Sequence, residues 1–177
     1  MRADPRTFFI TDHYRVGGHA ASPTTLEVPV SPWVVTRAIE APIDRVFDTV
    51  ADITQFSRAI PHITKVEFLS EQHSGVGTKF RETRLIKGKE TATELEVTEL
   101  VKNDRVRLIA DSHRTVWDSI FQVGPAGNGT ALTLRMEARS RGLIPRVMTR
   151  LIRGMVQRAL EADMDAVKLY CEQPRQV

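Results

Sequence analysis

The chain has 177 residues, of which 41% are hydrophobic and 27% charged, and its formal net charge at pH 7 is +3. This size and composition predict a single globular domain with a hydrophobic core, and exclude a fibrous or largely disordered chain. No apolar stretch approaches the roughly 18 residues of a membrane-spanning helix, no secretory signal pattern opens the chain, and Cys171 is the single cysteine, so we expect a cytoplasmic protein.

The first 32 residues differ from the rest. They contain four prolines and a "GGHAASPTT" stretch, and they show no sustained hydrophobic period. Such a segment cannot bury enough apolar surface to order itself, so residues 1–32 are predicted to be a flexible tail. The folded domain is expected to span residues 33–172, followed by a short tail over residues 173–177.

From Trp33 the pattern indicates one strand and two short helices. "WVVTRAIE" (33–40) alternates as a strand does, and Pro42 suits the first turn of a helix. In "PIDRVFDTVAD" the apolar residues fall at i, i+3, i+4 and i+7, which gives one buried face. Asp52 is a suitable N-cap for a second helix over residues 53–60.

The period then changes to two, which predicts six strands over residues 63–71, 78–86, 90–100, 105–112, 115–123 and 130–138. Their short polar connections, with "GPAGNG" (124–129) as a loop, imply antiparallel neighbours. After Pro145 a helical stripe runs from residue 147 to residue 170 and predicts one long C-terminal helix.

The resulting order is β-α-α-β6-α, an α+β fold. A seven-stranded antiparallel sheet has an apolar face to cover, and one helix covers it only if the sheet curls around that helix. Curvature of this degree leaves space between sheet and helix, and such space commonly becomes a ligand cavity.

The motifs support the same architecture. "VVTRAIEAPIDRVFDTVAD", followed by "GVGTKFRET", "ELEVTELVKNDRVRLIA" and "GNGTALTLRMEA", resembles the START-like helix-grip superfamily (SRPBCC). The closest group is the bacterial polyketide cyclase/dehydrase and lipid transport-like proteins, and the resemblance covers residues 33–172. It implies a curved sheet wrapped around the last helix, with a hydrophobic cavity and no required cofactor.

The alternation of residues along the strands and the spacing of apolar residues in the helices predict which side chains line the cavity. The inner residues should be mostly apolar and aromatic, with methionines that adapt to different ligands. The predicted ligand-contacting residues are Phe56, Ile60, Phe68, Phe80, Leu95, Val97, Leu108, Trp117, Ser119, Phe121, Leu134, Met136, Met148, Leu151, Ile152 and Met155.

Three polar residues are candidates for catalysis. If Phe80 points inward, Glu82 and Arg84 share its face, and a desolvated carboxylate beside a guanidinium suits proton transfer. His62 follows Pro61 and is expected near the cavity mouth. A bulge in this strand would instead turn both charges toward water. No histidine or cysteine spacing fits a metal site.

The positive charge is concentrated near the C-terminus, where seven arginines fall within residues 135–158 against one acid, Glu137. One interpretation is a solvated helix face, and another is a surface for an anionic membrane formed by Arg146, Arg150 and Arg153. Nucleic acid is not favoured, because exposed aromatic residues are not interleaved with these charges.

The sequence alone leaves two functions open. The first is a carrier or binding protein for a small lipid-like or polycyclic molecule. The second is an aromatic polyketide cyclase or dehydratase that uses Glu82, Arg84 and His62. The residues do not indicate the ligand or the oligomeric state.

Overall fold

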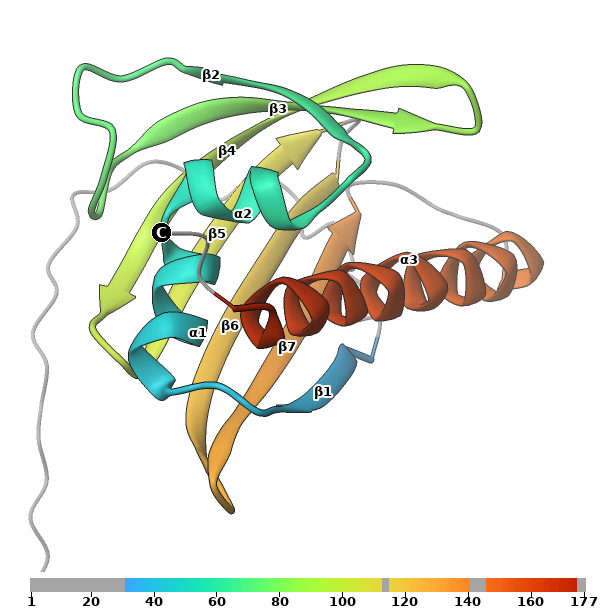
Figure 1. Cartoon of the computed structure of the whole chain (residues 1–177). Coiled ribbons are helices and arrows are strands. Elements are labelled where there is room, and N and C mark those ends of the chain that lie inside the picture. The colour runs from blue at the N-terminus through green and yellow to red at the C-terminus, as the bar shows by residue number, and fades with distance from the viewer. Residues whose placement is uncertain (1–30, 113–114, 141–145, 175–177) are drawn as a thin grey trace, which may run out of the picture.

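The computed structural model describes residues 31–112, 115–140 and 146–174, and its elements follow the predicted order (Figure 1). The strands and helices are β1 (Trp33–Ile39), α1 (Ile43–Ala51), α2 (Ile53–Ala59), β2 (Ile63–Phe68), β3 (Lys79–Ile86), β4 (Lys89–Val101), β5 (Arg105–Ser112), β6 (Thr115–Ala126), β7 (Gly129–Ser140) and α3 (Arg146–Glu172). Nearly all of the predicted N-terminal tail and the last three residues of the C-terminal tail lie outside the described residues. Within the described residues, no helix is long and apolar enough to cross a membrane.

All seven strands form one antiparallel sheet in the order β1-β7-β6-β5-β4-β3-β2. The sheet curves, and α1, α2 and α3 all lie on its concave side (Figure 1). The long helix α3 packs beside β1 at one edge, while α2 packs near β2 at the other. The predicted α+β helix-grip architecture is therefore confirmed.

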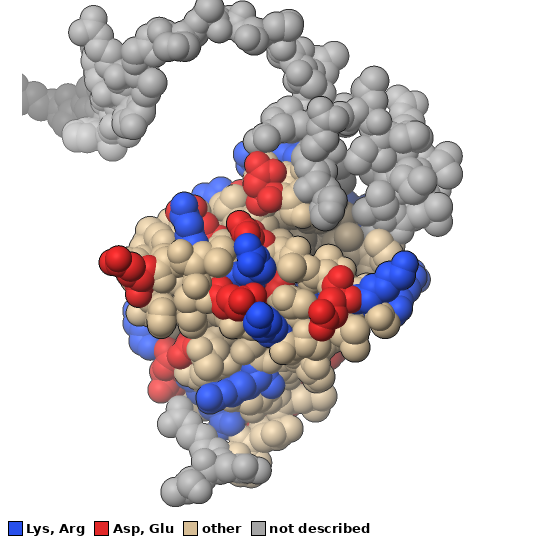
Figure 2. Space-filling model, turned by 90° about the horizontal axis from the view of Figure 1, so that it is seen from above, with Lys and Arg blue, Asp and Glu red and all other residues tan. Residues whose placement is uncertain are grey.

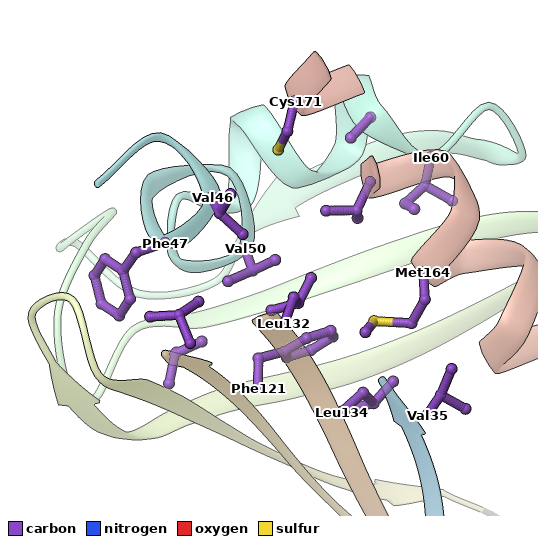
Figure 3. Packing of buried hydrophobic residues seen from close by; sticks show 14 of the residues in the cluster. Val35, Val46, Phe47, Val50, Ile60, Phe121, Leu132, Leu134, Met164 and Cys171 are labelled. Atoms are coloured by element: carbon purple, nitrogen blue, oxygen red, sulfur yellow. The ribbon is translucent and has the colours of Figure 1, made fainter. Parts of the chain in front are cut away.

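The two short helices are fixed by burial and capping. Val46, Phe47 and Val50 of α1 are buried in the core (Figure 3), as their spacing predicted. The Asp52 carboxylate accepts hydrogen bonds from the backbone N–H groups of Thr54 at 2.8 Å and Gln55 at 3.1 Å. These bonds satisfy two amides that the first turn of α2 leaves free, so Asp52 is the predicted N-cap.

The structure corrects two boundaries. The predicted loop 124–129 is a two-residue turn at residues 127 and 128, because β6 and β7 pair continuously to Ala126 and Gly129. Pro125 is tolerated there because the pairing of β6 with β5 ends at Gln122, so no second strand needs its missing N–H. Strand β2 ends at Phe68, where the amides of both following residues turn to the carbonyl of Lys79.

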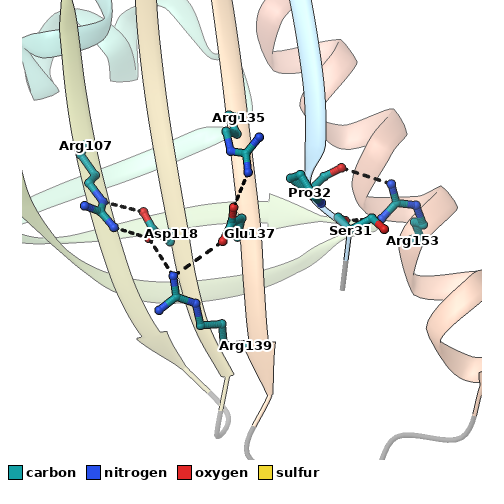
Figure 4. Close-up of polar contacts among 8 residues, drawn as sticks. All are labelled: Ser31, Pro32, Arg107, Asp118, Arg135, Glu137, Arg139 and Arg153. Atoms are coloured by element: carbon teal, nitrogen blue, oxygen red, sulfur yellow. Dashed lines mark hydrogen bonds and ion pairs between the residues drawn. The ribbon is translucent and has the colours of Figure 1, made fainter. Parts of the chain in front are cut away.

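The convex face carries a ladder of charged side chains across β5, β6 and β7 (Figure 4). Arg107 binds the Asp118 carboxylate with two hydrogen bonds of 2.8 and 2.6 Å, and Arg139 approaches the same carboxylate at 3.8 Å. Arg135 donates to Glu137 at 2.6 Å. The hydrogen bonds from Arg107, opposed by partial desolvation, hold the pKa of Asp118 below its ordinary value.

Position 129 requires a glycine because the backbone of β1 approaches it closely. A Cβ at this position would overlap the carbonyl of Ile39 on β1, whereas a Cβ at Gly124 on β6 would meet nothing within 4 Å. We expect Gly129→Ala to lower the free energy of unfolding by about 1–3 kcal/mol, as overpacking does. Chemical denaturation measures the free energy of unfolding, with Gly124→Ala as the matched control. Equal stability of the two variants would contradict the assignment.

The lowered pKa of Asp118 predicts that the stability of the fold depends on pH. A carboxylate with a lowered folded-state pKa stabilises the fold above its unfolded pKa of about 4, and this contribution disappears as pH falls through the folded value. Asp118→Asn should therefore cost about 1–2 kcal/mol at pH 7, and the difference from wild type should vanish in acid. A double-mutant cycle with Arg107→Gln isolates the pair. A pH-independent difference would show that packing, not charge, is lost.

Candidate functional site

A cavity of about 340 Å³ lies between the concave face of the sheet and the three helices. Most of its wall is apolar and comes from α1, α2, α3 and strands β3 to β7. Many of the predicted ligand-contacting residues line this space. They are Phe56, Phe80, Leu95, Leu108, Trp117, Ser119, Phe121, Leu134 and Met136.

Other predicted wall residues lie elsewhere. Ile60 and Val97 are fully buried in the core away from the cavity, and Phe68 stacks on His73 with ring centroids 4.1 Å apart. Met155 is 50% exposed, so its expected inward position is wrong. The side chains of Met148, Leu151 and Ile152 lie outside the part of the chain that the structure describes.

The phase of α3 explains the error at Met155. The side that faces the cavity is formed by Val156, Ala159, Leu160 and Asp163, which follow one another at intervals of three, one and three residues along one face of the helix. Met155 precedes this stripe by one position and is rotated toward solvent. A second apolar stripe, which includes Met155, lies next to this one on the surface of α3. Periodicity in the sequence alone therefore does not show which of the two stripes faces the cavity.

An apolar layer crosses the sheet within the cavity. Phe80 on β3 pairs with Leu95 on β4, Leu95 pairs with Ala110 on β5, and Ala110 pairs with Trp117 on β6. Because side chains alternate along a strand, the residues two positions further along each strand point into the same space. The strand register therefore determines which side chains form the layer next to this one.

That neighbouring layer is polar. Glu82 pairs with Thr93 across β3 and β4, and Ser112 lies two positions beyond Ala110 on β5. All three line the cavity. The predicted alternation of Phe80, Glu82 and Arg84 is thus present without a bulge in β3, and the alternative in which both charges face water is wrong: Glu82 is 7% exposed.

A charged cluster completes the polar side of the cavity. Arg84 donates from Nε to Glu82 on its own strand, and from Nη1 to the Asp163 carboxylate on α3 at 2.6 Å. His62 Nε2 lies 3.1 Å from Arg84 Nη1 and 3.0 Å from Asp163 Oδ1. The structure thus brings together the three predicted polar candidates, although His62 itself does not line the cavity.

The electrostatics of this cluster centre on Arg84. Burial alone would lower the pKa of its guanidinium, but the charges of Glu82 and Asp163 outweigh this effect and raise the pKa above its ordinary value. Arg84 is therefore a permanent cation. Removing it would leave two buried carboxylates facing each other, and an uncompensated buried charge typically costs about 3–5 kcal/mol.

Asp163 is the member of this cluster that the sequence analysis did not predict. It lies 79 positions from Arg84, and no local period connects the two. One signal was present: Asp163 is an acidic residue within the otherwise apolar stripe of Val156, Leu160 and Val167. An acid in such a stripe needs a buried partner, and the partner is Arg84.

The arginine-rich segment is only partly described. The side chains of Arg146 and Arg150 lie outside the described part, while Arg153 is engaged within the chain. It donates to the carbonyls of Ser31 at 2.6 Å and Pro32 at 3.2 Å (Figure 4), and its guanidinium lies 5.2 Å from the Trp33 ring centroid. These contacts fasten the start of β1 to α3.

Charged side chains of both signs lie together on the described surface. On the face shown in Figure 2, acidic and basic side chains lie next to one another. Exposed ion pairs such as Arg81–Glu94 and Lys65–Glu67 occur on the strands. Among the residues that the structure describes, no group of three or more His, Cys, Asp or Glu is arranged to hold a metal ion.

Solved structures with the same fold come from several kinds of protein. The protein TTHA0849 from Thermus thermophilus superposes with a TM-score of 0.66 at 18% identity, covering 80% of this chain and 97% of that one. A START superfamily protein from Mycobacterium smegmatis gives a TM-score of 0.65 at 17% identity, with coverages of 80% and 97%. At these identities the likeness establishes the fold alone.

A third similar structure is the di-domain ARO/CYC StfQ from the steffimycin biosynthetic pathway. Its TM-score is 0.68 at 12% identity, and the match covers 80% of this chain and 50% of that chain. No match was found among curated proteins.

The family itself follows from the sequence model rather than from these superpositions. The model described as "Polyketide cyclase / dehydrase and lipid transport" matches residues 33–172, which is every strand and helix of the structure. The chain therefore belongs to the polyketide cyclase/dehydrase and lipid transport family.

Proposed function

We propose that the chain binds a small hydrophobic molecule, lipid-like or polycyclic, within the cavity and acts as its carrier or binding protein. The observation that carries this proposal is the mainly apolar cavity of about 340 Å³ between the sheet and α3. That volume falls within the range of small-molecule sites, about 300–1,000 Å³. The family description, which names lipid transport, supports the same class of ligand.

The wall supplies enough apolar surface for useful affinity. A ligand that buries roughly 300 Å² of apolar surface gains about 7 kcal/mol before the costs of association are subtracted. Trp117, Phe121 and Phe56 provide aromatic contacts, and the Phe56 and Phe121 rings are already fixed edge to face at 5.6 Å. A pre-formed wall of this kind lowers the ordering cost of binding.

The second candidate is a cyclase or dehydratase that acts on a polyketide-like chain. The observation that favours it is the Glu82 carboxylate, buried in the cavity wall beside Arg84. A carboxylate there is placed to accept a proton from a bound substrate, and a guanidinium is placed to stabilise an oxyanion. The family description also names this chemistry.

Filling the cavity mouth tests the carrier proposal. Ala159 is exposed and lines the cavity, whereas Ala162, three residues along the same helix, is exposed and does not. Ala159→Phe should weaken binding of a polycyclic fluorescent probe by about tenfold or more, because its ring occupies ligand space. Ala162→Phe should leave the affinity unchanged. Equal affinities for the two variants would place the probe outside this cavity.

Glu82→Gln separates the two candidate functions. The amide keeps the shape of the side chain but cannot act as a base, so a carrier should retain probe affinity within about threefold. A cyclase should lose product formation from a linear polyketide thioester by about a hundredfold or more while still binding it. Mass spectrometry of the products measures turnover. Ring-closed product formed by wild type and lost in the variant would favour the enzyme over the carrier.

A further inference from the structure

Ser119 places a hydroxyl in the apolar part of the cavity wall. Its cross-strand neighbours are Leu108 on β5 and Met136 on β7, and all three residues line the cavity. The nearest residues on the same face of β6 are Trp117 and Phe121, which line the cavity as well. The hydroxyl is therefore bordered by apolar side chains both along its own strand and across the neighbouring strands.

The Ser119 hydroxyl is unpartnered among the described residues and open to the cavity. In the described part of the chain, Asp163 Oδ1 is the one side-chain oxygen or nitrogen of a non-exposed residue that both lacks a hydrogen-bond partner and is shut off from solvent. Ser119 Oγ also lacks a partner there, so it is not shut off. Because Ser119 lies on the concave face, the surface that its hydroxyl exposes is cavity surface.

An unpartnered hydroxyl in a binding wall favours some ligands over others. Solvent satisfies the hydroxyl while the cavity is wet, but a bound ligand displaces that solvent. A pure hydrocarbon would leave the hydroxyl desolvated with nothing in exchange, which costs affinity. A neutral oxygen on the ligand restores the hydrogen bond, because a serine hydroxyl can both donate and accept.

The strand register places Ser119 away from the polar layer. Ser112 of the polar layer lies two positions beyond Ala110 on β5, whereas Leu108, the partner of Ser119, lies two positions before Ala110. Ser112 and Leu108 are therefore four residues apart on one strand, which is roughly 13 Å at about 3.3 Å per residue. A polar group at the end of a ligand that contacts the polar layer does not also reach Ser119. The oxygen that pairs with Ser119 belongs to the body of the ligand.

We infer that Ser119 is a specificity-determining residue and that the ligand is a neutral, oxygenated hydrophobic molecule, with a carbonyl, ether or hydroxyl oxygen within its body that pairs with the Ser119 hydroxyl. This inference rests on the proposed function and names the chemical class of its ligand. Of the two kinds of ligand proposed above, an oxygenated polycyclic molecule fits this description better than a lipid whose chain is unsubstituted.

Fluorene and fluorenone test the inference as a matched pair. They share one three-ring apolar body and differ only where a central methylene group is replaced by a carbonyl group. Ser119→Ala removes the hydroxyl with little change in volume. We expect fluorenone to bind this variant about five- to tenfold more weakly than wild type, whereas fluorene should bind it equally well or more tightly.

Displacement of a fluorescent polycyclic probe measures both affinities. Because each ligand is compared with itself across two proteins, the difference in hydration between fluorene and fluorenone cancels. Ser74→Ala is the matched control, because Ser74 is exposed and does not line the cavity, and it should change neither affinity. Circular dichroism verifies that the variants are folded.

Thr93→Val distinguishes Ser119 from the hydroxyl of the polar layer, since Thr93 also lines the cavity. This variant should leave fluorenone binding within about twofold of wild type. If Ser119→Ala weakens both ligands equally or neither of them, or if Thr93→Val weakens fluorenone more than Ser119→Ala does, the inference is wrong while the proposed function stands. Failure of both ligands to bind the wild-type chain would contradict the proposed function itself, and the inference with it.

Discussion

The ion pair between Arg84 and Asp163 joins two parts of the fold that otherwise approach one another only across the cavity. Arg84 belongs to β3, next to one edge of the sheet, whereas α3 packs beside β1 at the other edge. The charges of Glu82 and Asp163 raise the pKa of the Arg84 guanidinium above its ordinary value, so Arg84 stays charged within the fold. A buried pair of this kind is weak evidence for stability, but it fixes one arrangement of strand and helix, because breaking it leaves an unpaired charge.

The cavity follows from how much of the sheet the helices can cover. Seven strands curve around α1, α2 and α3, and Val46, Phe47 and Ile60 are buried between the helices and the sheet without lining the cavity (Figure 3). The helices leave a cavity over part of the concave face, and the strand register determines which side chains line it. One cross-strand layer is apolar and the next is polar, so the register of the strands makes the cavity amphipathic.

Local patterns predicted the fold well because each element is defined by its own periodicity. Alternation in β3 correctly placed Phe80, Glu82 and Arg84 on one face, since the pairing of β3 with β4 is continuous. Asp163 could not be predicted as their partner, because that contact depends on how α3 crosses the sheet. Met155 was misplaced for a related reason: two adjacent helical stripes are both apolar, and only the packing of α3 selects between them.

If the chain is a binding protein, apolar molecules bind in this cavity and not on exposed apolar side chains. Methyl-resolved NMR titration with anthracene tests it directly, because the chain contains both kinds of methyl group. We expect saturable shifts at Leu95, Leu108 and Leu134, which line the cavity, and none at Leu69 or Leu169, which are 45% and 62% exposed. Shifts confined to the exposed leucines, or no saturable shift at the cavity leucines, would contradict it.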